Sequence, residues 1–195
     1  GFVHADDLGV SLAERSALTL NQMELGGGRN FAGLQAELQG RGSRFLSRTC
    51  YLTLGDGETD VNYNAVQRGR RTWCSMSFDG VLRDRGKKIC RGTIDFRRGS
   101  AGSAGDEQEN VLLLSDSVEN QSIPMILCEE EDVEGRHGAT IGRLDEQMLF
   151  YLETRGIDAK AAEEMMVYAR LGTVTREIRD EALQQRINEY IRSRF

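Results

Sequence analysis

Residues Gly40 to Gly57 read GRGSRFLSRTCYLTLGDG, and this stretch decides the expected fold. The stretch begins and ends with a short glycine-rich segment, which is typical of strands bounded by turns. We interpret Ser43 to Thr53 as a strand, a one-residue corner and a second strand. No two-residue hairpin signal such as Asn-Gly interrupts it. The stretch therefore favours a parallel β-helix over a meander of hairpins.

The same pattern of short apolar runs and polar joints continues to about residue 143. It allows three architectures, namely a β-sandwich, a β-barrel and a parallel β-helix, and the absence of an exact repeat leaves all three open. Arg91 to Ser100 has the same strand, corner and strand character as Ser43 to Thr53. The single proline, Pro124, interrupts little strand pairing.

Helical periodicity begins after Gly142 and predicts three helices. Aspartates at N-cap positions and glycines as stops give the expected bounds as Asp145 to Gly156, Asp158 to Gly172, and about Val174 to the C-terminus. The chain is therefore expected to comprise a β-helix core over residues 1–143 and a C-terminal helical domain over residues 144–195.

Composition narrows the functional classes. The chain has 195 residues, 39% hydrophobic and 29% charged, and a net charge of −6. These values fit a soluble globular protein, and the acidic balance argues against non-specific nucleic-acid binding. The longest apolar run, Val111 to Leu114, is far too short to span a membrane. Because the sequence begins at Gly1 without a methionine, we expect it to be a piece of a longer protein.

The four cysteines form no CxxC pair, so the sequence does not support a zinc ribbon. We expect them to be small buried hydrophobic residues in a reducing compartment, and we assign none a catalytic role.

Residues Asp132 to Ile157 read DVEGRHGATIGRLDEQMLFYLETRGI. This string closely resembles the signature of the SufB/SufD family, which has a DDV-like turn followed by HGAT, LDE, LFYL and SRGI. Further segments resemble the family in the same order: Gly40 to Ser43, Gly80 to Leu82, Gly92 to Ile94, Gln108, Asn110 to Ser115, and Pro124. The resemblance is strongest from Gly80 to Leu171 and corresponds to the C-terminal half of a typical member.

The resemblance implies a right-handed parallel β-helix followed by a small helical domain. It implies pairing through the β-helix with a SufB-type or identical subunit, and docking of a SufC-type ABC ATPase by the C-terminal helices. The assembled complex builds iron–sulfur clusters in the cytoplasm, and the subunit itself is not an enzyme. The sequence has no GxxxxGK[ST] phosphate loop, which agrees with that last expectation.

His137 resembles the family histidine near the subunit interface, where a neutral imidazole can ligate iron or shuttle protons. The alternative is a junction histidine that bonds to the backbone at the end of the β-helix. Many members have a cysteine two residues earlier, where this chain has Gly135. A thiolate is the usual iron–sulfur ligand, so we expect a SufD-like role with no tightly bound cofactor and no resident metal, and at most a transient cluster in the complex.

The first C-terminal helix is the expected partner-binding element. Phe150, Tyr151 and Leu152 are adjacent and cannot all face one side of a helix, so at least one is exposed or lies at an interface. Aromatic residues and arginine are enriched in interface hot spots. The expected partner-binding residues are Leu144, Asp145, Phe150, Tyr151, Arg155 and Gly156.

Two rival functions remain. Parallel β-helices also host polysaccharide lyases and acyltransferases, which need catalytic acids, bases or Ca²⁺ ligands in one groove. A degenerate family member that only homodimerises or regulates the ATPase is the second rival.

Overall fold

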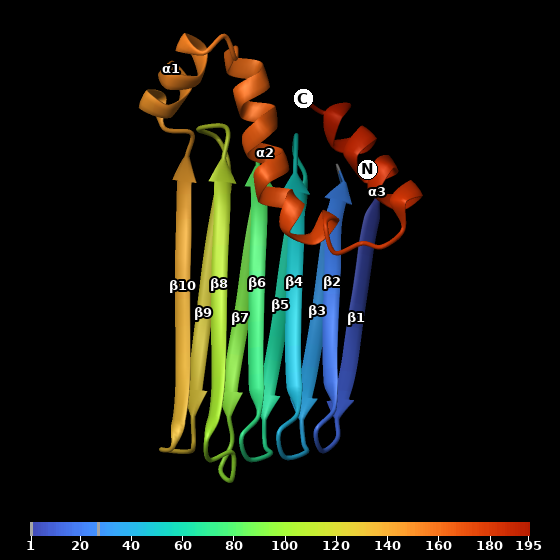
Figure 1. The fold of residues 1–195 in the computed structure, drawn as a ribbon, viewed down its shortest axis with the longest axis vertical. Coiled ribbons are helices and arrows are strands. Elements are labelled where there is room, and N and C mark those ends of the chain that lie inside the picture. Colours follow the sequence, from blue (N-terminus) through green and yellow to red (C-terminus); the bar gives the residue numbers. More distant parts are fainter. Residues whose placement is uncertain (1, 27) are drawn as a thin grey trace.

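The computed structural model describes residues 2–26 and 28–195, which form a solenoid of ten strands followed by three helices (Figure 1). Gly1, on which the expectation of a longer protein rests, lies outside the described residues. The strands are β1 Val3–Leu12, β2 Ala17–Gly26, β3 Arg29–Leu38, β4 Arg44–Thr53, β5 Glu58–Gln67, β6 Trp73–Leu82, β7 Lys87–Phe96, β8 Ser103–Leu113, β9 Glu119–Cys128 and β10 Val133–Arg143.

Successive strands alternate between two parallel five-stranded sheets. The odd-numbered strands form one sheet in the order β1-β3-β5-β7-β9, and the even-numbered strands form the facing sheet. The register pairs Arg29 with Glu58 and Glu58 with Lys87, so one rung of the solenoid takes 29 residues here. The chain climbs as a right-handed coil (Figure 1). The predicted parallel β-helix is confirmed, and the sandwich and barrel alternatives are wrong.

The expected one-residue corners are also wrong. Ser43 to Thr53 falls almost entirely in β4, which runs unbroken from Arg44 to Thr53. Arg91 to Ser100 covers the second half of β7 and the loop after it. Ser47 and Thr49, within this stretch, are polar yet fully buried between the sheets. A strand alternates its side chains, so these two residues continue the inward row of β4 rather than break it.

The inward side chains of the two sheets make one apolar core. Its buried members are Leu12, Ala32, Leu34, Ala36, Leu38, Phe45, Tyr51, Val61, Tyr63, Ala65, Cys74, Met76, Phe78, Leu82, Cys90, Ile94, Phe96 and Val111. Tyr63 and Phe78 meet edge to face with ring centroids 5.5 Å apart. Parallel strands covered on both faces are the usual condition for a parallel sheet, and here the opposite sheet supplies one of the covers.

The helices are α1 Glu146–Thr154, α2 Ala159–Thr175 and α3 Glu181–Arg192. Asp145, Asp158 and Asp180 cap them, each accepting a hydrogen bond from a backbone N–H of its first turn. The first two caps were predicted. The prediction that Gly172 ends the second helix and that the third begins near Val174 is wrong.

Helix α2 continues past Gly172 because Val174 and Thr175 are buried against the solenoid. Figure 1 shows α2 lying across the even-numbered strands. Together with α3 it forms a second core cluster on the outer face of that sheet, whose buried members are Cys50, Leu52, Val81, Leu112, Val167, Leu171, Val174 and Ile191. Helix α1 has no buried residue and projects beyond the end of β10 (Figure 1). None of the helices that the structure describes is both long and apolar enough to cross a membrane.

The packing of α2 on the sheet gives a stability prediction. Replacing Leu171, which is fully buried in the second cluster, by alanine is expected to lower the free energy of unfolding by about 2–5 kcal/mol, because it removes apolar contacts and leaves a cavity. The exposed Leu183 of α3 is the matched control, and L183A is expected to cost about 0.5 kcal/mol or less. Urea unfolding followed by circular dichroism measures both values, and equal losses would contradict the packing.

Candidate functional site

His137 lies in β10 at the open end of the solenoid. Its register partner on β8 is Glu107. A Cβ atom built on Gly135 would lie 2.9 Å from Ile126 Cγ2 and 3.1 Å from a ring carbon of Phe96, so Gly135 faces the interior. His137, two residues later, faces the same way. It is nevertheless exposed, because no strand in the described chain stacks on the outer edge of β10.

Behind this end, the interior holds a buried charged group. The Lys88 ammonium, on β7, is fully buried and pairs with the carboxylate of Glu109 on β8. It also donates to Ser122 Oγ at 3.1 Å. The Tyr51 hydroxyl donates to Glu109 Oε1 at 3.2 Å. A buried ion pair of this kind is costly unless its members have further hydrogen bonds, and Ser122 and Tyr51 provide them.

Glu107 is the member of this group nearest in register to His137. It is buried, and its Oε2 atom has no hydrogen-bond partner in the structure. Burial raises the pKa of Glu107 from 4.5 to about 7, and the carboxylate of Glu109 adds to the rise. The carboxyl of Glu107 therefore changes charge near neutral pH.

Two glycines that carried the family resemblance make room for these side chains. A Cβ atom on Gly80 would lie 1.9 Å from a ring carbon of Tyr51, and one on Gly92 would lie 2.2 Å from Glu107 Oε1. No other residue fits at either position without moving the buried polar side chain. Gly80 and Gly92 are thus part of how the interior accommodates Tyr51 and Glu107.

The interior group around Lys88 was not predicted from the sequence. A period-two reading anchored on the buried Ile94 would have placed Cys90 and Lys88 on the inward row of β7. A lysine on an inward row indicates a buried ion pair, because a lysine is almost never fully buried unless it is paired.

Three of the cysteines behave as expected. Cys50, Cys74 and Cys90 are buried, and burial raises the pKa of Cys50 to about 11, raises that of Cys74 to about 12, and raises that of Cys90 well above its ordinary value. These thiols stay protonated at neutral pH and are poor nucleophiles. Cys128 is exposed, contrary to expectation, because it ends β9 at the open end of the solenoid.

The six predicted partner-binding residues all lie around α1, away from His137, but they do different things. Leu144 packs against the second core cluster, Asp145 caps the helix by accepting from Gln147 N at 2.9 Å, and Gly156 adopts a φ of +84° just after the helix. These three residues shape the helix and its two ends.

The other three predicted residues form an exposed surface. Phe150 is 67% exposed and Tyr151 is 53% exposed. The Arg155 guanidinium lies 5.2 Å from the centre of the Tyr151 ring. A groove of about 330 Å³ meets α1 at Leu149, and it is lined by Leu113, Leu114, Ser115, Asp116, Arg143, Leu144, Leu149 and Glu163. Two exposed aromatic rings and an arginine are typical of a protein-binding surface.

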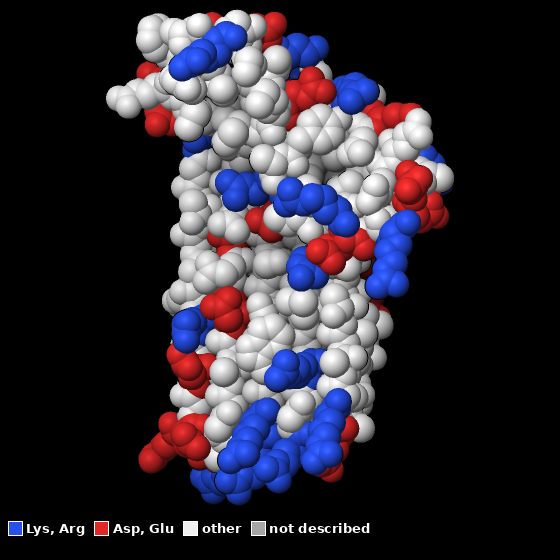
Figure 2. Space-filling model, in the orientation of Figure 1, with Lys and Arg blue, Asp and Glu red and all other residues white. Residues whose placement is uncertain are grey.

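Positive charge gathers at the opposite end of the strands despite the net charge of −6. Figure 2 shows basic side chains crowded at this end, and the loops that follow β1, β3, β5 and β7 each contain arginine. The exposed arginines of these loops are Arg15, Arg41, Arg68, Arg70, Arg71 and Arg98. Total charge did not reveal this local concentration, which appears only when successive rungs align their loops.

Comparison with known proteins shows which family this chain resembles. Residues 1–170 match a family model described as "SUF system FeS cluster assembly, SufBD core domain". The chain is 33% identical to iron–sulfur cluster assembly protein SufD of Escherichia coli over 55% of this chain and 25% of that protein. It is 28% identical to SufD of Bacillus subtilis over 70% and 32%, and 23% identical to SufB of the same organism over 72% and 30%. The chain thus spans a quarter to a third of these relatives.

The raised pKa of Glu107 gives a pH prediction. With a folded pKa near 7 and an unfolded value near 4.5, the carboxyl is protonated in both states below pH 4.5. Between pH 4.5 and 7 the folded state holds this proton and the unfolded state does not. The free energy of unfolding therefore falls as pH rises through this range to 7. Glu107→Gln keeps the shape without the charge, so it is expected to stabilise the fold at pH 8 relative to the parent and to change it little at pH 5. Unfolding curves at both pH values measure this, and an equal effect at the two would contradict it.

Proposed function

This chain belongs to the SufBD family of the SUF iron–sulfur cluster assembly system and is SufD-like, and from that premise we propose that it is a non-catalytic scaffold subunit. It pairs with a SufB-type subunit through the open end at β9 and β10, and it docks a SufC-type ABC ATPase through α1. The observation that carries the proposal is that both elements expose apolar side chains that nothing in the described chain covers.

The ATPase-docking part rests on α1. An isolated nine-residue helix is marginal in water. This one has no buried residue and is fixed chiefly by its caps and by its contacts with α2. Its aromatic residues Phe150 and Tyr151 nevertheless face solvent. Burying them against a partner would recover apolar free energy that the isolated chain lacks.

The pairing part rests on the last rung. Ile123, Met125 and Leu127 alternate along β9, and each is more than 40% exposed. They form a row on the outer face of the sheet, beside the open end. An exposed apolar row next to an unpaired strand edge is an aggregation hazard unless a partner covers it. A second β-helix subunit fits both features.

A nascent cluster is the cargo of this assembly. At the paired end this chain offers the imidazole of His137 and the exposed thiol of Cys128 at the end of β9. A thiolate at position 135 has no space, because a Cβ atom there would approach Ile126 and Phe96 closely. Any sulfur ligand beyond Cys128 would therefore come from the partner subunit, and a cluster would be held transiently across the interface.

These observations give less support to the two rival functions, a β-helix enzyme and a degenerate family member. The two histidines lie at opposite ends of the solenoid, on β1 and β10 (Figure 1), so they share no groove in which an acid and a base could act together. The buried cysteines are protonated thiols. A degenerate subunit that only homodimerises would keep the row on β9 but would not need the exposed aromatic surface of α1.

The docking assignment is tested by co-elution with the SufC-type ATPase on a sizing column. The double variant Tyr151→Ala, Arg155→Ala is expected to weaken the complex by at least tenfold, because exposed aromatic and arginine side chains supply most hot-spot energy. Leu183→Ala, an exposed apolar truncation on α3, is the matched control and is expected to bind like the parent. A parent chain that fails to bind, or a double variant that binds as well as the control, would rule out docking by α1.

The pairing assignment is tested by light scattering of the chain alone and mixed with a SufB-type subunit. Met125→Asp places a charge in the row on β9 and is expected to abolish pairing while leaving the unfolding curve close to that of the parent. Asn62→Asp adds the same charge on an exposed position of β5 in the same sheet, away from the open end, and is expected to pair normally. If both variants pair equally well, β9 is not the interface.

A further inference from the structure

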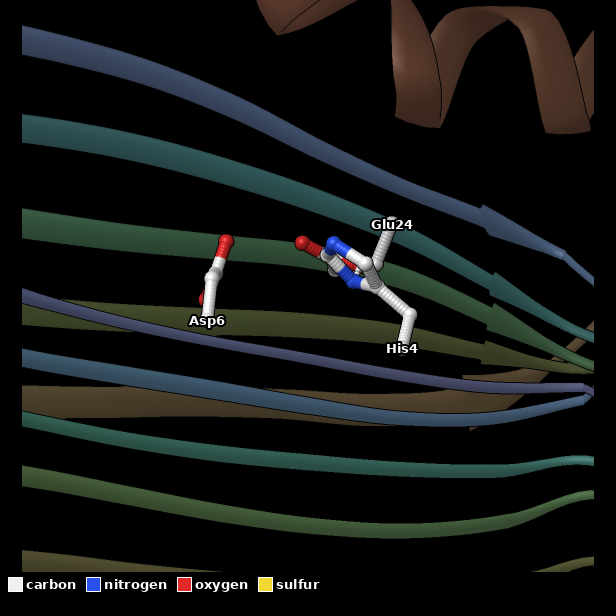
Figure 3. A group of neighbouring side chains, drawn as sticks. All are labelled: His4, Asp6 and Glu24. Atoms are coloured by element: carbon white, nitrogen blue, oxygen red, sulfur yellow. Dashed lines mark ion pairs between the residues drawn. The ribbon is translucent and has the colours of Figure 1, made fainter.

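The first rung of the described residues brings together three side chains that the assembly role does not use. His4 and Asp6 project from β1, and Glu24 projects from the facing β2, so that they converge between the sheets (Figure 3). One donor atom of each lies within 4.8 Å of the others. His4 Nδ1 is 3.5 Å from Glu24 Oε2.

The charges in this group are not balanced. Glu24 is only 5% exposed, and within the described residues His4 is its only ion-pair partner at 3.5 Å. Asp6 forms no ion pair with any lysine or arginine in that part of the chain. Glu109, the comparable buried carboxylate at the far end, has Lys88. Buried carboxylates are normally paired or bound to a metal ion.

A second layer of hydrogen bonds fixes the two carboxylates in place. The Gln22 amide donates to Asp6 Oδ2 at 3.0 Å and to Glu24 Oε1 at 2.7 Å. The Tyr63 hydroxyl in turn donates to Gln22 Oε1. Burial, and the carboxylates of Asp6 and Glu24, raise the pKa of Tyr63, so it remains a donor. Partners of this kind orient the ligands of metal sites and tune their affinity.

An independent observation points to a ligand at the same place. Asn30 is the register partner of His4 on β3, so its side chain lies beside that of His4 on the inward face. It is 3% exposed, and its Nδ2 atom is buried without a hydrogen-bond partner. The oxygen and nitrogen of an amide are interchangeable by rotation. Rotated, Asn30 presents an oxygen to the group in place of an unsatisfied N–H.

We propose that His4, Asp6 and Glu24 bind a divalent first-row transition-metal ion such as Zn²⁺ or Fe²⁺, with Asn30 as an additional oxygen donor. An imidazole combined with carboxylates favours these ions over Mg²⁺ and Ca²⁺, which prefer oxygen ligands alone. Two atoms that each lie about 2.1 Å from one ion are at most about 4.2 Å apart. The donor atoms lie within 4.8 Å of one another, so small side-chain rotations would bring all three into contact with one ion.

The test is calorimetric titration of the tag-free 195-residue chain with Zn²⁺, followed by the same titration with Mg²⁺. One equivalent of Zn²⁺ is expected to bind, to raise the melting temperature, and to be undisturbed by an equal concentration of Mg²⁺. Absence of Zn²⁺ binding, or equal competition by Mg²⁺, would overturn the proposal.

Variants locate the bound ion. Glu24→Gln keeps the shape and its bond to Gln22, and Asp6→Asn alters an exposed residue that is not part of the core. Each is expected to weaken Zn²⁺ binding at least tenfold while melting like the metal-free parent. Asp7→Asn, on the next and exposed residue, and His137→Ala, which removes the other histidine, are the controls and are expected to bind normally. Binding that survives Glu24→Gln and Asp6→Asn, or disappears with His137→Ala, would place the ion elsewhere and refute the site.

Discussion

The hydrogen-bonded register between equivalent strands of successive rungs is the constraint on which the rest of this structure depends. Once Arg29 pairs with Glu58 and Glu58 with Lys87, every second residue faces the interior and stacks on its equivalent in the next rung. The inward rows are therefore mainly apolar. The inward charges of Lys88 and Glu109 pair with each other, and Gly80 and Gly92 leave space for buried polar side chains.

A stacked solenoid necessarily has two ends whose strands lack a neighbour. In this chain the two ends are different. The first rung is lined by His4, Asp6 and Glu24, and the last presents His137 beside an exposed apolar row. The helices add a third feature, the exposed helix α1. Helices α2 and α3 bury the outer face of one sheet, whereas α1 has no buried residue. The candidate sites therefore lie at the first and last rungs of the described residues and on the helix that stays exposed.

Much of the fold could be predicted from the sequence, and the failures have physical causes. The two helix caps at Asp145 and Asp158 were found because a capping aspartate leaves a local signal. The corner expected within Ser43 to Thr53 is absent, since the polar Ser47 and Thr49 continue the inward row, and local hydropathy cannot show that a polar side chain is inside. The third helix was misplaced because the burial of Val174 depends on a sheet that is distant in sequence. The interior group around Lys88 and the metal-type group around His4 depend on register, which the absence of an exact repeat concealed.

We propose that the open end at β9 and β10 and the helix α1 are the two partner-binding surfaces. Hydrogen–deuterium exchange on the chain, alone and assembled with a SufB-type subunit and a SufC-type ATPase, measures whether they become covered. Amides of β10 and of α1 are predicted to become protected on assembly, with β1 and β2 unchanged. Protection confined to the first rung or to α3, with α1 exchanging as in the isolated chain, would contradict the account.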